Sequence, residues 1–352
     1  MTTLAATRVV IADDSALMRS VLASALREAG LEVIGQACDG DEALALCEKL
    51  APDVLSLDLA MPGRDGISVL RELRARSVPI PVVVVSAFSA AAGARAVDAL
   101  AEGAFDLVAK PSVRGELDGF THELVDRIEL ARASRRRNGL PETPVRSAPA
   151  PVRRVMPRDA RPGSTGRRIV VMACSTGGPR ALAELLPKLP APLGDGTLIV
   201  QHMPHGFTAS LASRLDRASK LTVNEAHGNE RLDADHALIA PGGQHMRVGS
   251  GGIVTLSDEP PVDGLRPRAD LTIRDAAEVW GDRVLLVVMT GMGRDGLEGA
   301  ADVHKAGGRV IVEAASSAVV HGMPRAIAEA GLADAEYDLS ALPEAIMAEV
   351  GA

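Results

Sequence analysis

Hydrophobic residues in the first third of the chain form short runs that alternate with longer stretches of helical periodicity. The run at 9–12 contains no polar position, which is typical of a strand covered on both faces. Met18, Val21 and Ala25 follow at the spacing of one helix face, and Gly30 is placed to end that helix. Further runs predict strands at 32–37, 54–59, 82–85 and 105–109. This alternation predicts a flavodoxin-like doubly wound domain with five parallel strands over residues 1–133.

The alternation stops between residues 134 and 166 and resumes at Arg168. The interruption holds eight Arg and six Pro against one Glu and one Asp, without hydrophobic periodicity. A basic run can serve as a nucleic-acid arm, but the prolines and the acidic domains on either side favour a flexible linker. Residues 167–352 then predict a second doubly wound α/β domain. Its clearest strands are 169–173, 198–201 and 284–290, and its clearest helices are 179–189 and 296–306.

Composition narrows the range of partners. The net charge is -8 and aromatic residues make up only 2% of the chain, which argues against nucleic acid or anionic lipid as a primary partner. The longest uncharged run, 77–94, is interrupted by Pro79 and Pro81, so we expect no membrane insertion. Three scattered cysteines are too few for a disulfide framework or a zinc site. Because the start of the chain has no signal-peptide pattern, we expect a cytoplasmic protein.

Acidic residues gather where two strands of the first predicted sheet end. Asp13 and Asp14 follow the first strand and Asp58 ends the third. The carboxyl ends of parallel strands meet at one edge, so these carboxylates are expected to converge and to hold a hard cation such as Mg²⁺. Ser86 and Lys110 follow the fourth and fifth strands, where a hydroxyl and an ammonium can hold the phosphoryl oxygens of an aspartyl phosphate.

A second set of chemical groups follows strands of the other domain. Ser175 lies on a predicted sharp turn between a strand and a helix that Pro179 opens, although an anion-binding or capping turn would have the same pattern. His202 ends the next strand and is the preferred general base, with His205 as a neighbouring alternative that is expected to begin the following helix. Asp295, in a Gly-rich loop, can orient the imidazole or simply cap a helix.

The first domain resembles a response-regulator receiver domain along its whole length. The resemblance rests on the segments VVIADDS, DVLSLDLAMPGRDG, VVVVSAF and GAFDLVAKP. It implies that Asp58 is the phosphoacceptor, that Asp13 and Asp14 hold Mg²⁺ with it, that Ser86 is the switch hydroxyl and that Lys110 contacts the phosphoryl group. Ala60 departs from relatives with a methylesterase domain, which usually have Glu at this position.

From about Arg168 onward the chain resembles the catalytic domain of chemotaxis protein-glutamate methylesterases. The resemblance rests on STGG at 175–178, QHMP at 201–204, IAPGGQHM at 239–246, TGMGRDG at 290–296 and HGMPRAI at 321–327. It implies a nucleophile at Ser175, a base at His202, an orienting acid at Asp295, groups around the oxyanion at Thr176 and Met292, and no cofactor for the hydrolase.

Two departures from this second family lie near the implied triad. Cys174 stands where relatives usually have a small residue, which makes its thiol an alternative nucleophile, although its side chain should point away from that of Ser175. The stretch Arg266-Pro267-Arg268-Ala269-Asp270 replaces the Arg-Pro-Ser-Val-Asp that relatives favour. The changed pair, Arg268 and Ala269, could reshape the substrate groove without disabling the triad.

Taken together, the two resemblances imply a phosphorylation-regulated hydrolase that removes methyl esters from glutamates of methyl-accepting chemoreceptors and deamidates specific glutamines. The implied phosphodonor is a chemotaxis histidine kinase, and the unphosphorylated receiver is expected to cover the catalytic edge. Two other readings remain. A DNA-binding response regulator would need a helix-turn-helix and a basic effector, and neither is present in the sequence. A catalytically silent receiver-adaptor that binds receptors or kinase would not need the triad.

Overall fold

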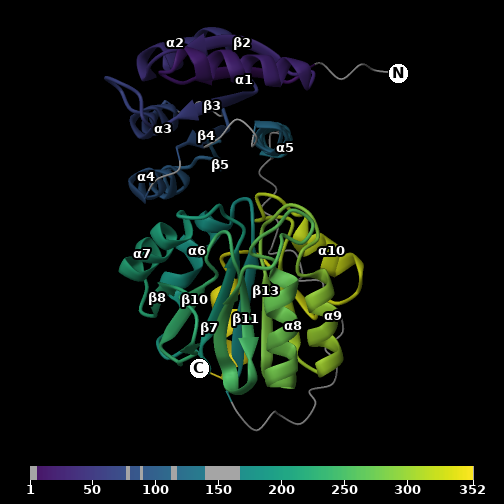
Figure 1. Ribbon diagram of the computed structural model, residues 1–352. Helices are drawn as coiled ribbons and strands as arrows, with labels where there is room; N and C mark the ends of the chain where they lie inside the picture. The colour runs from purple at the N-terminus through teal and green to yellow at the C-terminus, as the bar shows by residue number, and fades with distance from the viewer. Residues whose placement is uncertain (1–5, 77–79, 88–89, 112–116, 139–166, 352) are drawn as a thin grey trace. The chain divides into compact units, whose positions relative to one another are not determined.

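The computed structural model describes residues 6–76, 80–87, 90–111, 117–138 and 167–351 (Figure 1). The chain divides into two compact units, Met1–Val145 and Arg146–Ala352, each with its own sheet. Residues 139–166, which make up most of the predicted linker, lie outside the described part. Helix α5 continues to Asn138. Residues 134–138 are therefore helical, although the sequence had predicted that the linker begins at Ser134.

The first unit is a five-stranded parallel sheet in the order β2-β1-β3-β4-β5, which confirms the flavodoxin-like prediction. Strands β3 and β4 are buried along their whole length, because helices cover both faces of a doubly wound sheet. The strands are β1 (Arg8–Ala12), β2 (Glu32–Ala37), β3 (Val54–Asp58), β4 (Val82–Ser86) and β5 (Asp106–Ala109); the helices are α1 (Ala16–Glu28), α2 (Gly40–Leu50), α3 (Gly66–Ala75), α4 (Ala90–Ala101) and α5 (Leu117–Asn138).

Polar side chains begin three helices of this unit. Ser15, Asp39 and Asp65 each accept a hydrogen bond from a backbone N–H in the first turn of α1, α2 and α3. Such caps satisfy N–H groups that have no partner within the helix and thereby fix where each helix starts. Two of these caps follow strands that carry the acidic residues, so they also set the loops at that edge of the sheet.

The second unit is built on a seven-stranded parallel sheet in the order β15-β14-β13-β6-β7-β10-β8, with a three-stranded antiparallel sheet beside it. The strands are β6 (Ile169–Cys174), β7 (Thr197–Gln201), β8 (Thr222–Glu225), β9 (Glu230–Arg231), β10 (His236–Ile239), β11 (His245–Gly249), β12 (Ile253–Ser257), β13 (Val284–Val288), β14 (Arg309–Glu313) and β15 (Ala335–Tyr337); the helices are α6 (Gly178–Leu185), α7 (Thr208–Ala218), α8 (Ala269–Trp280), α9 (Leu297–Ala306), α10 (Met323–Glu329) and α11 (Leu342–Val350).

The main core of the second unit lies between its large sheet and helices α8, α9 and α10. Its members include aliphatic residues of β6, β7, β13 and β14, apolar residues of β10, β11 and β12, and apolar positions of those helices. Helices α8 and α9 lie side by side and cover one face of the sheet (Figure 1). Both helices begin near the carboxyl ends of the central strands, and this is where the candidate site forms.

Several predicted boundaries need correction. The helix that was predicted to reach Leu189 ends at Leu185 and is followed by a 3-10 turn. The strand predicted to reach Thr290 ends at Val288. Helix α7 begins at Thr208, so His205 lies in the loop before it and not at its first turn. In the described part of the chain, no helix is both long and apolar enough to cross a bilayer.

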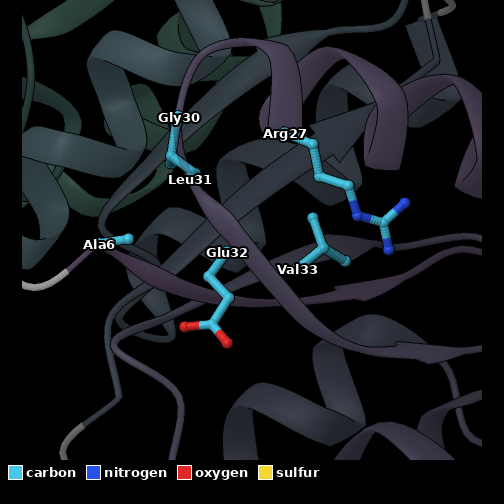
Figure 2. Close-up of a pocket in the computed structure, with 6 residues that line it drawn as sticks. All are labelled: Ala6, Arg27, Gly30, Leu31, Glu32 and Val33. Carbon is cyan, nitrogen blue, oxygen red and sulfur yellow. The ribbon is translucent and has the colours of Figure 1, made fainter.

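A pocket on the first unit lies away from the acidic residues. It is lined by the end of α1, the start of β2 and the chain just before β1. Figure 2 shows the lining residues, which are Ala6, Arg27, Gly30, Leu31, Glu32 and Val33. These residues stand at the amino ends of the strands. The acidic residues stand at the carboxyl ends, so this pocket belongs to the opposite edge of the sheet.

Candidate active site and acidic cluster

The three acidic residues predicted at the first sheet come together. One carboxylate oxygen each from Asp13, Asp14 and Asp58 lies within 4.8 Å of the others. Asp13 and Asp58 are buried, whereas Asp14 is exposed. Their positions follow from the register, because β1 and β3 are neighbours in the sheet and end at the same edge. The cluster therefore joins two desolvated carboxylates to one that faces solvent.

Lys110 neutralises the buried part of this cluster. Its Nζ lies 2.6 Å from Asp58 Oδ2 and 2.7 Å from Asp13 Oδ2. Burial alone would lower the pKa of Lys110, but the interactions with the two carboxylates outweigh burial and raise it. The backbone N–H of Lys110 donates to the carbonyl oxygen of Ser86, which brings the two residues to adjacent strand ends as predicted. Ser86 itself is buried.

The cluster suits a hard dication. Within the described residues, the one partner of Asp13 Oδ2 is the Lys110 ammonium at 2.7 Å. Burial is the largest cause that raises the pKa of Asp13, and Lys110 offsets it only in part. A buried carboxylate oxygen whose one partner is an ammonium, beside two further carboxylates, is the oxygen-rich ligand set that Mg²⁺ prefers. The residues present therefore fit the predicted ion.

In the second unit, Ser175 follows directly on the end of β6. Its backbone N–H donates to the Thr290 carbonyl oxygen, and its own carbonyl oxygen accepts from the Gly178 N–H and the Gln201 side-chain amide. A side chain at Gly178 would lie 1.9 Å from Gln201 Oε1, and one at Gly291 would lie 2.9 Å from Ser175 Cβ. Glycine is needed at both positions because Gly178, at the start of α6, packs against Gln201, and Gly291 packs against Ser175.

His202 lies next to this turn. Strands β6 and β7 pair in parallel with Cys174 opposite Gln201, and the His202 backbone N–H donates to the Cys174 carbonyl oxygen at 3.1 Å. The serine and the histidine thus follow paired residues of two adjacent strands. Within the described residues, no hydrogen bond joins the Ser175 hydroxyl to the His202 ring. Such catalytic bonds often form only when substrate is present.

Asp295 completes the predicted set. Its Oδ2 lies 2.7 Å from Nε2 of His202. Burial would raise the pKa of Asp295, but the hydrogen bond and charge of His202, with help from the Ala269 N–H, hold it well below its usual range. Asp295 therefore stays ionised beside the imidazole. Since Nε2 is committed to Asp295, Nδ1 is the ring nitrogen left to act as a base.

The capping interpretation of Asp295 also has a basis, and it involves two helices: Oδ1 accepts the N–H of Gly296 just before α9, the expected helix, and the carboxylate also reaches α8. Its carboxylate accepts the N–H groups of Ala269 and Asp270, which form the first turn of α8, while α9 follows it in the chain. In return, Asp270 Oδ1 accepts the N–H groups of Gly296 and Gly299 at the start of α9. The two aspartates thus cap each other's helices.

Two residues near Asp295 were not predicted as site residues. Asp270 is buried beside it, and the guanidinium of Arg268 lies against both carboxylates. The only signal in the sequence was the unusual Arg-Pro-Arg-Ala-Asp stretch. No pattern of hydrophobicity indicated that its side chains reach the Gly-rich loop, because the contact spans more than twenty residues of chain.

The other residues that the sequence predicted near the triad differ in how far their side chains are buried. Thr176 is buried in the serine turn and its carbonyl oxygen accepts from the Thr290 hydroxyl, whereas the Met292 side chain is 38% exposed. His205 bonds to the Gly242 carbonyl oxygen through Nδ1. Cys174 is fully buried, its thiol lies 3.1 Å from Gln201 Oε1, and burial raises its pKa. A thiol in this state is a poor nucleophile, which weighs against the Cys174 alternative.

Two family models match the chain, CheB methylesterase over residues 170–346 and response regulator receiver domain over residues 9–120. A protein-glutamate methylesterase/protein-glutamine glutaminase of Symbiobacterium thermophilum is 42% identical to it, and the match covers 98% of this chain and 97% of that protein. The chain belongs to the CheB methylesterase family. A relative with the same name from Pyrococcus abyssi is 38% identical, with coverage of 97% of this chain and 93% of that protein.

A solved structure agrees with this assignment. The CheB methylesterase catalytic domain of Thermotoga maritima is 40% identical, with a TM-score of 0.50, and the match covers 53% of this chain and 99% of that domain. CheB relatives such as those above match the chain almost from end to end, so the receiver domain and the methylesterase domain occur together in them as they do here.

Proposed function

We propose that this CheB family member hydrolyses methyl esters of glutamate side chains on methyl-accepting chemoreceptors. The observation that carries the proposal is the 2.7 Å pair between His202 and Asp295 beside the Ser175 turn. This is the base-and-orienter arrangement that activates a serine nucleophile. The names of relatives with full-length similarity support the choice of substrate.

In the proposed reaction, the Ser175 hydroxyl attacks the ester carbonyl while Nδ1 of His202 takes its proton. Ionised Asp295 fixes the imidazole through Nε2 and stabilises the imidazolium that forms. The imidazolium then protonates the leaving methoxide, methanol departs, and water hydrolyses the acyl-enzyme to a glutamate carboxylate. Attack on a glutamine side chain releases ammonia by the same steps, which accounts for the proposed deamidase activity.

The oxyanion that forms during attack needs hydrogen-bond donors. In the described part of the chain the backbone N–H of Met292 has no hydrogen-bond acceptor, and it lies one residue after Gly291, which packs on Ser175. Thr176 immediately follows the nucleophile. We assign the oxyanion-stabilising role to these two positions, because donors aimed at developing charge contribute strongly to acyl transfer.

The receiver domain is proposed to control this activity through phosphorylation of Asp58 by a chemotaxis histidine kinase. Mg²⁺ held by Asp13, Asp14 and Asp58 would supply positive charge that offsets the phosphoryl oxygens. Lys110 contacts Asp58 directly, and Ser86 is linked to the Lys110 backbone, so both can respond to a new phosphoryl group. With kinase and phosphodonor present, Asp58→Asn should lack the rise in methanol release that wild type shows; equal rises would contradict this control.

The decisive experiment is methanol release from a receptor fragment carrying tritiated methyl esters. Wild type should release methanol and Ser175→Ala should not, because no other group in the site replaces the nucleophile. Ser213→Ala, which removes an exposed serine on α7, is the matched control and should retain activity. If wild type bound the fragment without releasing methanol, and Ser175 failed to react with a fluorophosphonate, the silent-adaptor reading would replace this proposal.

A further inference from the structure

Arg268 occupies a position where a cation is unexpected. It is the residue just before α8, its side chain makes no capping bond to that helix, and it is only 6% exposed. The amino end of a helix carries partial positive charge, so small polar or acidic residues are favoured there and a buried cation is unfavourable. A residue that breaks this local rule must be stabilised by other groups, and such positions often serve a function.

Three carboxylates surround the guanidinium of Arg268. Its Nη2 and Nε donate to Asp270 Oδ2 at 2.8 and 3.1 Å, and Nε also lies 2.9 Å from Asp295 Oδ1. Its Nη1 donates to Asp263, a mostly exposed residue on the preceding loop, at 2.8 Å. Burial would lower the pKa of Arg268, but the charge of Asp295 and the bonds to Asp270 outweigh it. The side chain is therefore a buried, fully paired cation.

The charge on Arg268 is needed because Asp270 and Asp295 are both buried and close together. Burial, followed by the charge of Asp295, raises the pKa of Asp270 to about 6. The charged and titratable groups that contact the pair are His202 from the end of β7 and Arg268 before α8. Arg274, one turn after Asp270 on α8, also feels the charge of Asp270, but its ion pairs are with Glu298 and Asp302. His245 on β11 accepts the Arg268 backbone N–H through Nδ1. Arg268 is thus the cation that contacts both carboxylates of this pair.

We propose that Arg268 is a positioning residue for the reaction: it lies between Asp270 and Asp295, lowers the pH at which the two carboxylates take up a shared proton, and so extends the Asp295–His202 pair to more acidic pH. The inference rests on the proposed function, since it concerns the orienting acid of that site. Without the guanidinium, the two carboxylates would share a proton at higher pH, because like charges in a buried site disfavour double ionisation. The shared proton would compete for the lone pairs of Asp295.

The test is a pH profile of Ser175 labelling by a fluorophosphonate, measured on the full chain and paralleled by methanol release. The acid limb of the profile is the pH range in which the labelling rate falls as the pH is lowered. In Arg268→Met, this limb should move to higher pH by about one unit, so the labelling rate near pH 6 should fall about tenfold. Arg268→Lys keeps a cation, so its acid limb should lie between those of wild type and Arg268→Met. Arg268→Met combined with Asp270→Asn should recover the wild-type limb, because one of the two competing carboxylates is gone.

Arg247→Met is the matched control. Arg247 also pairs with a buried aspartate of α8, Asp275, through bonds of 2.7 and 2.9 Å, but not with Asp295. Arg247→Met should lower the melting temperature of the protein without moving the acid limb of the pH profile. The proposal is overturned if Arg268→Met leaves the limb in place, if Arg247→Met moves it equally, or if the added Asp270→Asn change restores nothing.

Carboxyl-carbon NMR on aspartate-labelled protein separates this inference from the proposed function. Asp270 should titrate near pH 6 in wild type and at higher pH in Arg268→Met, whatever the substrate is. If these titrations behave as expected but wild type releases no methanol, the substrate assignment fails and the role of Arg268 in charge balance stands. If methanol is released and the titration does not move, the role of Arg268 fails alone.

Discussion

The two sheets of this protein gather carboxylates at the same kind of edge but treat them differently. In the receiver domain, the described partner of Asp13 Oδ2 is the Lys110 ammonium alone, and Asp14 faces solvent. In the methylesterase domain, both oxygens of Asp295 accept backbone N–H groups and Oδ2 also meets His202. The first cluster has unused ligand capacity, whereas the second is saturated.

The difference follows from what each edge must do. A site that gains and loses a phosphoryl group needs side chains that can change partners, and a lysine ammonium on a flexible stem provides this. A site that directs one proton needs a carboxylate that cannot turn, and backbone N–H groups at a helix start provide that. The same topology thus supports a responsive site in one domain and a rigid one in the other.

The rigid site should be the more sensitive to a single change. Asp295→Asn removes the charge opposite His202 and presents an amide to donors that expect an acceptor, so we expect methanol release to fall about 10³–10⁴-fold. The melting response of the receiver domain to Mg²⁺ should be unchanged, which provides the internal control. A loss of less than tenfold would show that Asp295 does not orient the base.

The responsive site should lose stability and regulation together. Lys110→Met leaves two buried carboxylates without their cation, at a cost of about 2 kcal/mol once the partial exposure of Lys110 is allowed for. Because the pKa of Lys110 is raised on folding, this stabilisation is complete below the ordinary lysine pKa of about 10.4 and is lost as the pH rises through the raised value.

Thermal melting at neutral pH checks this expectation for Lys110→Met. Excess Mg²⁺ should raise the melting temperature of the variant more than that of wild type, because the cation no longer competes with an ammonium for Asp13 and Asp58. Acetyl phosphate should fail to stimulate methanol release by the variant. Equal Mg²⁺ responses in the two proteins would contradict the view that Lys110 occupies this charge site.

The smallest effect is expected at Cys174, which touches the rigid site without carrying charge. Cys174→Ala removes the contact with Gln201 and should cost about 1 kcal/mol of unfolding free energy, with activity within a few-fold of wild type. Mass spectrometry after iodoacetamide treatment at neutral pH should find the exposed Cys38 alkylated and Cys174 intact. Inactivation that tracks Cys174 modification would return the thiol to the list of nucleophiles.

The sequence placed the strand ends well because buried parallel strands are continuous apolar runs, and the residue after each run marks the edge. This is why Asp13, Asp58, Ser175 and His202 were found at the correct edges. The antiparallel sheet that contains His245 was missed, because its short strands mix polar and apolar residues without clear alternation.

The arrangement around Asp295 could not be derived from local pattern. The expected cap was for the following helix, and Asp295 does accept the N–H of Gly296 before it, but the carboxylate also caps α8, whose first turn lies more than twenty residues earlier in the chain. Hydrophobic periodicity reports which face of a helix is buried, but it carries no information on which distant side chain reaches the first turn. For the same reason Arg268 was visible only as a departure from relatives and its partners were not.

The exchange of caps between α8 and α9 has a consequence for folding cooperativity. Asp295 holds the first turn of α8 and Asp270 holds the first turn of α9, so neither turn can fray without weakening the other. Amide hydrogens at both helix starts should therefore exchange with solvent in a single opening event, as one foldon. Protection at Asp270 and Gly299 would then report, without any substrate, on whether the orienting carboxylate is in place.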